Sequence, residues 1–138
     1  MDPHLECLVE RGRHYFESGK RGTGEHDVCD DYCLSADFFE KADKIASRLD
    51  SLNHNYLFLA AQAYLSAALY ARAKRRQEDT LYYIGKCATS CEDIILSRGH
   101  KENIISDCEV NRVTIKTISL LEKALQFSFI LQSELQQR

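Results

Sequence analysis

Length and charge place this chain among single-domain globular proteins. With 138 residues, 44% of them apolar, it can bury one core without disulfides or a structural metal. The 18 basic and 21 acidic residues leave a net charge of -3, which excludes the strong positive field of many nucleic-acid-binding proteins. One proline and six glycines, four of which precede residue 25, leave room for long helices.

Apolar residues that recur every three or four positions predict two helices in the N-terminal part of the chain. The first spans residues 2–19, because Asp2 can cap it and Pro3 suits its first position. Residues 20–27 contain two glycines and no periodicity, so we expect a loop there. The second helix spans residues 29–50, and its core stripe consists of Tyr32, Ser35, Phe39, Ala42, Ala46 and Leu49.

The segment 53–76 is the most apolar in the chain and is predicted to be the central helix. Alanines dominate it, and apolar residues lie on nearly every face, a pattern typical of a helix surrounded by other helices. The apolar run at 56–71 is interrupted by Gln62 and Ser66 and is shorter than a bilayer span. No apolar leader precedes it, so we expect an intracellular protein, cytoplasmic or nuclear, without a membrane span.

Two more helices are predicted to complete one all-α domain over residues 1–138. The fourth helix spans 79–98, begins at a cap formed by Asp79 or Thr80, and ends at Gly99. Its predicted core stripe is Leu81, Ile84, Ala88, Cys91 and Ile95. The fifth helix spans 103–137, with Val113, Thr117, Leu120, Ala124, Phe127 and Leu131 in register. The end of this helix is apolar on more than one face, so it either packs across the domain or leaves an exposed surface.

Three segments share one arrangement of small and bulky residues. Residues 35–42 read SADFFEKA, residues 80–87 read TLYYIGKC, and residues 117–124 read TISLLEKA. In each, a small residue is followed by two bulky residues and then by a lysine and another small residue. Small residues at this spacing let a helix approach its hairpin partner closely, so the pattern favours repeated helical hairpins.

The residues of the first hairpin resemble the tetratricopeptide family of helix-turn-helix repeats. In that family a small residue precedes an aromatic residue by three positions in the first helix, as Gly12 and Tyr15 do here. The second helix carries small, aromatic and small residues at offsets of four and seven, as Ser35, Phe39 and Ala42 do. The helical hairpins of microtubule-interacting and trafficking domains are a second resemblance.

The tetratricopeptide resemblance implies an array of antiparallel hairpins, about five helices in all, closed by a long C-terminal helix. It also implies adaptor or assembly work, in which a groove binds a peptide or helix of a partner protein. Tyrosines suit such a groove because they combine apolar contact with a polar tip. We expect the groove to be lined by Tyr15, Tyr56, Tyr64, Tyr70 and Tyr82. Self-association into a homodimer is expected through Phe127, Phe129, Ile130 and Leu131.

Metal binding and redox chemistry are the alternatives raised by the six cysteines. A zinc site can be drawn from His26, Cys29 and Cys33, with Cys108 or an acidic neighbour as the fourth ligand. Structural zinc sites usually contain two closely spaced ligand pairs, which these residues do not form. We therefore expect free thiols that pack as small apolar residues, with no metal and no cofactor.

Two further features of the sequence could indicate catalysis or nucleic-acid binding, but each has a simpler explanation. Arg48 and His54 have a spacing that resembles the RNase motif of HEPN helical domains. This resemblance implies the alternative function, which is that of an RNA-cleaving domain. A capped helix end explains the same two residues. The basic group 72–76 is explained by the helix macrodipole, which favours cations at a C-terminus. We therefore expect neither an enzyme nor a nucleic-acid partner.

Overall fold

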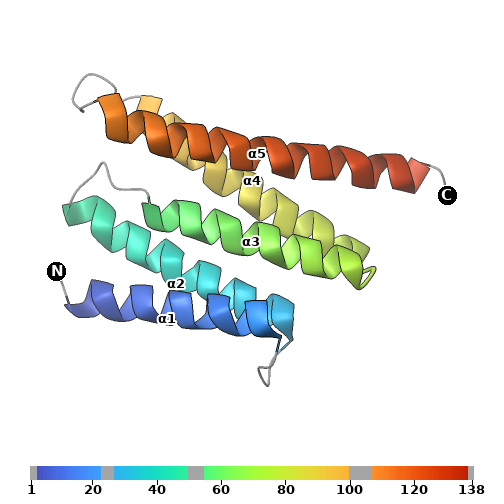
Figure 1. The fold of residues 1–138 in the computed structure, drawn as a ribbon, viewed down its shortest axis with the longest axis horizontal. Helices are drawn as coiled ribbons and strands as arrows, with labels where there is room; N and C mark the ends of the chain where they lie inside the picture. Colours follow the sequence, from blue (N-terminus) through green and yellow to red (C-terminus); the bar gives the residue numbers. More distant parts are fainter. Residues whose placement is uncertain (1–2, 23–26, 50–54, 100–106, 137–138) are drawn as a thin grey trace.

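The computed structural model describes residues 3–22, 27–49, 55–99 and 107–136 (Figure 1). These residues form five α-helices and no strand, so the predicted all-α class is confirmed. The helices differ from the predicted spans by a few residues at their ends. They are α1 (Pro3–Arg21), α2 (Val28–Leu49), α3 (Asn55–Ala73), α4 (Gln77–Gly99) and α5 (Asp107–Gln136).

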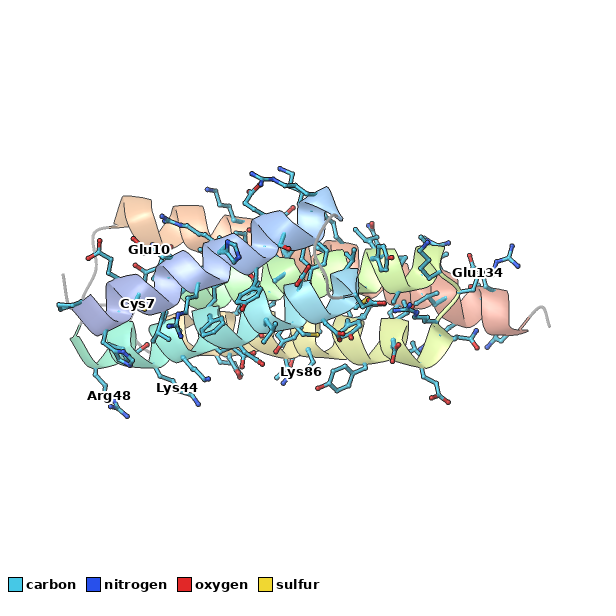
Figure 2. All side chains as sticks on the ribbon, turned by 90° about the horizontal axis from the view of Figure 1, so that it is seen from below. Cys7, Glu10, Lys44, Arg48, Lys86 and Glu134 are labelled. Carbon is cyan, nitrogen blue, oxygen red and sulfur yellow. The ribbon has the colours of Figure 1, made fainter. Side chains whose placement is uncertain are left out.

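Consecutive helices run antiparallel and pack against one another in chain order (Figure 1). Two views show two layers, with α1, α3 and α5 in one and α2 and α4 in the other (Figures 1 and 2). The chain therefore zigzags between the layers. As a result, α3 packs between α2 and α4 and also touches α5, whereas α1 and α5 lie at the two ends of the array.

Close approach between α1 and α2 depends on small residues at their contact. Gly12 has no side chain, and the ring of Phe39 fills the space beside it. One helical turn away from that ring, the Ser35 hydroxyl donates a hydrogen bond of 2.7 Å to the carbonyl oxygen of Gly12. This bond satisfies a buried hydroxyl, and it pins the two helices at the residues of the tetratricopeptide-like pattern.

The central position predicted for α3 is confirmed, and alanines make it possible. The fully buried residues of this helix are small, apart from one tyrosine: Ala60, Ala61, Ala63, Tyr64, Ala67, Ala68 and Ala71. The larger apolar residues, such as Phe58 and Leu65, are half-buried, and 52% of Leu69 is exposed. Helix α3 is thus wrapped by its neighbours on two sides but not all round.

A three-residue turn joins α3 to α4, and it corrects the predicted start of the fourth helix. Arg75 adopts a left-handed conformation with φ of 59°. The Arg76 amide donates to the Ala71 carbonyl at 2.8 Å and the Arg75 amide donates to the Arg72 carbonyl at 2.9 Å, which is the Schellman arrangement. Because this turn is so tight, α4 begins at Gln77, before the predicted caps Asp79 and Thr80.

The core stripe of α4 is also shifted from the predicted one. Leu81 is 40% exposed, and Ala88 and Ile95 are only half-buried. The buried residues are Thr80, Tyr83, Ile84, Cys87, Ser90, Cys91 and Ile94. The stripe includes polar residues because their groups find partners: the Thr80 hydroxyl, for example, donates to the Arg76 carbonyl at 2.7 Å.

Helix α5 follows its predicted register. Thr117, Leu120, Ala124, Phe127 and Leu131 are all buried against the rest of the domain. The predictions about Asp2 and about the side chains of Leu49 and Val113 lie outside the described residues. None of the helices, in the part of the chain that the structure describes, is sufficiently long and apolar to cross a membrane.

Candidate functional site

The five tyrosines predicted to line a groove lie on three different helices. Tyr15 is on α1, Tyr56, Tyr64 and Tyr70 are on α3, and Tyr82 is on α4, where it is 60% exposed. Tyr56 and Tyr70 are half-buried against the core. The structure does not bring these five side chains together in one groove.

Tyr64 contributes to the packing between helices and is not part of an exposed surface. Its ring is buried, and its hydroxyl donates a hydrogen bond of 2.9 Å to Glu40 Oε1 on α2. The Lys86 ammonium on α4 lies 5.5 Å from the ring centroid. Burial, followed by the bond to Glu40, raises the pKa of Tyr64 well above its usual value. Tyr64 therefore links α2, α3 and α4 and is not available to a partner.

A small groove does exist between the first and third helices, but other residues form it. It has a volume of about 180 Å³ and is lined by Arg13, Phe16, Glu17, Phe39, Leu59 and Gln62. Pockets for small ligands usually measure roughly 300–1,000 Å³, and a docked helix needs a longer surface. This groove is accordingly too small to hold a helix of a partner.

The predicted self-association residues at the end of α5 divide between the core and the surface. Phe127 and Leu131 are buried in the domain. Phe129 is 70% exposed and Ile130 is 43% exposed, on different sides of the helix. Phe129 belongs to a larger exposed apolar surface that the sequence analysis did not single out.

That surface is the α5 outer face, which we define as Ile118, Leu121, Leu125 and Phe129. These residues are spaced by three, four and four positions and so share one side of the helix. Ile118 is 42% exposed and Leu125 is 55% exposed, whereas Leu121 is half-buried. The sequence signal was an apolar residue directly after each of three core residues of α5, which are Thr117, Leu120 and Ala124.

The position of α5 in the array explains why this face is open. Helix α3 is flanked by α2 on one side and by α4 on the other. Helix α5 packs on α4 and touches α3 (Figure 1), and the described residues include no helix that covers its outer face. Exposed apolar surface arranged in a continuous stripe usually marks an interaction site.

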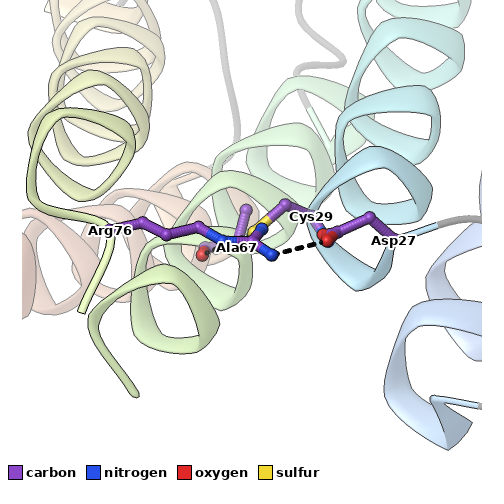
Figure 3. Close-up of polar contacts among 4 residues, drawn as sticks. All are labelled: Asp27, Cys29, Ala67 and Arg76. Carbon is purple, nitrogen blue, oxygen red and sulfur yellow. Dashed lines mark hydrogen bonds and ion pairs between the residues drawn. The ribbon is translucent and has the colours of Figure 1, made fainter. Parts of the chain in front are cut away.

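The basic group at the α3–α4 turn is partly occupied by ion pairs. Arg72 Nη2 lies 2.7 Å from Glu134 Oε1 of α5, and the Arg72 guanidinium stacks 4.9 Å from the Phe127 ring centroid. Arg76 Nη2 lies 2.9 Å from Asp27 Oδ2 (Figure 3). These contacts attach α5 and the start of α2 to the turn between α3 and α4.

The hydrogen-bonded corner in Figure 3 also accounts for one candidate zinc ligand. The Cys29 amide donates to Asp27 Oδ1 at 2.9 Å, and the Cys29 thiol donates to the Ala67 carbonyl at 3.5 Å. Burial, together with the nearby Asp27 charge, raises the pKa of the Cys29 thiol to about 11. Cys29 is therefore a protonated thiol that fills a helix contact.

The other candidate metal and catalytic residues are only partly within the described residues. Cys33 is half-buried, and Arg48 is exposed on the last turn of α2. His26, His54 and the side chain of Cys108 lie outside the described residues. Among the residues that are described, no group of three histidine, cysteine or acidic side chains is placed to hold a metal ion.

Comparison with known proteins adds no family to this description. The chain matches no protein-family model, no curated protein and no solved structure. The surfaces of the fold are therefore the remaining guide to function.

Proposed function

We propose that this chain is a non-catalytic protein-interaction domain that binds an amphipathic helix along the α5 outer face. The single observation that carries the proposal is the exposed stripe of Ile118, Leu125 and Phe129 on a helix at the end of the array. An amphipathic helix that packs there would cover the outer face of α5, as α4 covers one side of α3. Helix recognition of this kind uses apolar anchors at helical spacing.

The zigzag of antiparallel helices supports the tetratricopeptide-like interpretation of the fold. Such arrays stack one hairpin on the next, so an end helix presents apolar surface until another element covers it. In this chain the two ends of the array differ in the chemistry of their exposed side chains. The outer face of α5 is apolar, and Glu122 is the charged residue next to it.

We further propose that a second copy of the chain supplies the partner helix. If two α5 helices pair antiparallel about Leu125, Leu125 lies opposite its own copy and Leu121 lies opposite Phe129. The same patch then serves both subunits, as in the two-fold interfaces of most homodimers. Glu122 lies opposite the uncharged Ser128 in this register, so the pairing brings no like charges together.

Light scattering on the purified protein tests this function. We expect the wild type to change from a mass near 15.8 kDa to about twice that value as its concentration rises through roughly 1–300 µM. A variant with Leu125→Glu and Phe129→Glu should stay monomeric, because each carboxylate would be buried unpaired in the interface.

The matched control is Leu96→Glu, since Leu96 on α4 is 65% exposed and lies outside the α5 outer face. It should dimerise like the wild type. A wild-type protein that is monomeric over the whole concentration range, or a dimer that both variants leave intact, contradicts the proposal.

A further inference from the structure

A second surface of different chemistry lies on the other end of the array, on the outside of the α1–α2 hairpin (Figure 2). Its centre is an aromatic stack that joins the two helices. The rings of Tyr15 and Phe38 are nearly parallel, with 5° between their planes and 5.7 Å between their centroids. His14 adds an edge-to-face contact of 5.3 Å with Tyr15.

Two cations are held against this stack. The Arg11 guanidinium lies 5.8 Å and the Lys41 ammonium 5.6 Å from the centroid of the Phe38 ring. Contact with the ring orients each cation through its electrostatic attraction to the π-system but uses few of its hydrogen-bond donors. Further along α2, Lys44 and Arg48 extend from the edge of the helix that faces away from α1 (Figure 2).

None of these four cations is within ion-pair distance of a carboxylate among the described residues. Arg72 and Arg76 elsewhere in the chain do have such partners. In a protein with a net charge of -3, these four cations on one helical hairpin therefore lack ion-pair partners among the described residues, although Glu10, Asp37 and Glu40 lie nearby in sequence. We call Arg11, Lys41, Lys44 and Arg48, with Tyr15 and Phe38, the α1–α2 basic patch.

The patch includes a hollow. It has a volume of about 470 Å³ and is lined by Cys7, Glu10, Arg11, His14, Tyr15 and Phe38. Arg11 offers it several N–H donors, and Glu10 offers an acceptor. Such a lining can pair with side-chain carboxylates of a bound chain while Glu10 accepts a backbone N–H group of the same chain.

We infer that the α1–α2 basic patch binds an acidic segment of another polypeptide. Charge complementarity argues for this partner, because Arg11 and Lys41 lie about one ring and Lys44 and Arg48 follow Lys41 at helical spacing, all without an ion pair among the described residues. Single-stranded nucleic acid fits less well. Its bases bind by stacking on open aromatic faces, whereas Phe38 is already covered by Tyr15 and by cations.

Fluorescence anisotropy with a labelled peptide of alternating glutamate and serine tests the inference. The wild type should bind this peptide more tightly than a labelled single-stranded RNA of equal charge. Replacing Arg11→Gln and Lys41→Gln together should weaken peptide binding about tenfold or more, because two charge-assisted contacts are lost. Arg11→Lys with Lys41→Arg retains both charges and should keep most of the affinity.

Lys116→Gln with Lys123→Gln is the matched control, because it removes the same charge from exposed positions of α5. It should change peptide affinity less than about twofold, since distant exposed charges are screened. Leu125→Glu should bind the peptide normally, which separates this surface from the dimer interface. No peptide binding by the wild type, an equal loss in both double variants, or tighter binding of the RNA overturns the inference.

Discussion

At the scale of single residues, two helical glycines face opposite environments. A Cβ atom added to Gly12 would lie 2.8 Å from Cε1 and 2.9 Å from Cζ of Phe39, far inside normal contact distance. A Cβ atom added to Gly85, by contrast, would meet nothing within 4 Å. At position 12 glycine is therefore required by packing, whereas at position 85 glycine only lowers the helix propensity.

Gly12→Ala should reduce the free energy of unfolding by about 1–3 kcal/mol, because the methyl group overpacks the α1–α2 contact. Gly85→Ala should increase it by about 0.5–1 kcal/mol, since alanine favours the helix and the position is open. Urea denaturation of both variants measures these changes. Equal effects at the two glycines would show that α1 and α2 do not approach each other as described.

The ion pair between Asp27 and Arg76 predicts a pH dependence of stability. The hydrogen bond and charge of Arg76 hold the pKa of Asp27 below its usual value of 3.8. A carboxyl group with a lowered pKa in the folded state stabilises the protein above the unfolded pKa, and this contribution disappears as the pH falls through the folded pKa.

Thermal unfolding of the wild type and Asp27→Asn checks this dependence. The wild type should have the higher melting temperature above about pH 5, and the difference should close as the pH falls below the usual aspartate range. The difference should also shrink at high salt, because the pair is partly exposed. A difference that stays constant down to about pH 2 would show that the charge of Asp27 is not its source.

At the scale of the element, α3 works as the central helix because its contacts are made by alanines. Ala67 is fully buried, and its carbonyl accepts the Cys29 thiol hydrogen bond. Leu69, two residues later, is 52% exposed. Apart from Tyr64, the buried residues of α3 are therefore alanines, and its larger apolar residues lie where the helix is less covered.

Ala67→Leu should lower the free energy of unfolding by about 1–3 kcal/mol, because three added carbons must displace a neighbouring helix. Leu69→Ala, which changes the same two residue types in the opposite direction, should alter stability by less than about 0.5 kcal/mol. Urea denaturation compares them. A larger loss from Leu69→Ala would mean that the buried and exposed sides of α3 are assigned wrongly.

Elements also show which parts of the fold could be predicted from sequence. The core stripe of α5 was predictable because Leu120, Phe127 and Leu131 fit one helical period. The stripe of α4 was not, since Leu81 and Ile95 fit a period equally well. The buried residues are instead ones such as Thr80, whose hydroxyl donates a hydrogen bond to the Arg76 carbonyl. Only the placement of the neighbouring helices decides between two such registers.

Part of the candidate site could be predicted from the sequence and part could not. Exposure of Phe129 and Ile130 followed from an apolar segment with more than one apolar face. Ile118 and Leu125 escaped notice because each directly follows a core residue, Thr117 or Ala124, and a one-dimensional pattern does not show which neighbour faces inward. The placement of α4 and α3 beside α5 was needed to separate them.

At the scale of the whole molecule, the array presents two ends with different chemistry. One end carries the α1–α2 basic patch, and the other carries the apolar α5 outer face. Helix α5 has 30 residues and is about 45 Å long, compared with about 29 Å for the 19 residues of α3. It extends past the α3–α4 turn (Figure 1), so another helix has room to pack along it.

The most direct test of the central claim uses opposite charges at the proposed two-fold axis. In the antiparallel pairing, residue 125 of one copy lies opposite residue 125 of the other. Leu125→Glu and Leu125→Lys should each be monomeric by light scattering, because like charges would meet, whereas their equimolar mixture should show about twice the monomer mass. A mixture that remains monomeric at concentrations where the wild type dimerises would contradict the pairing of α5 with α5.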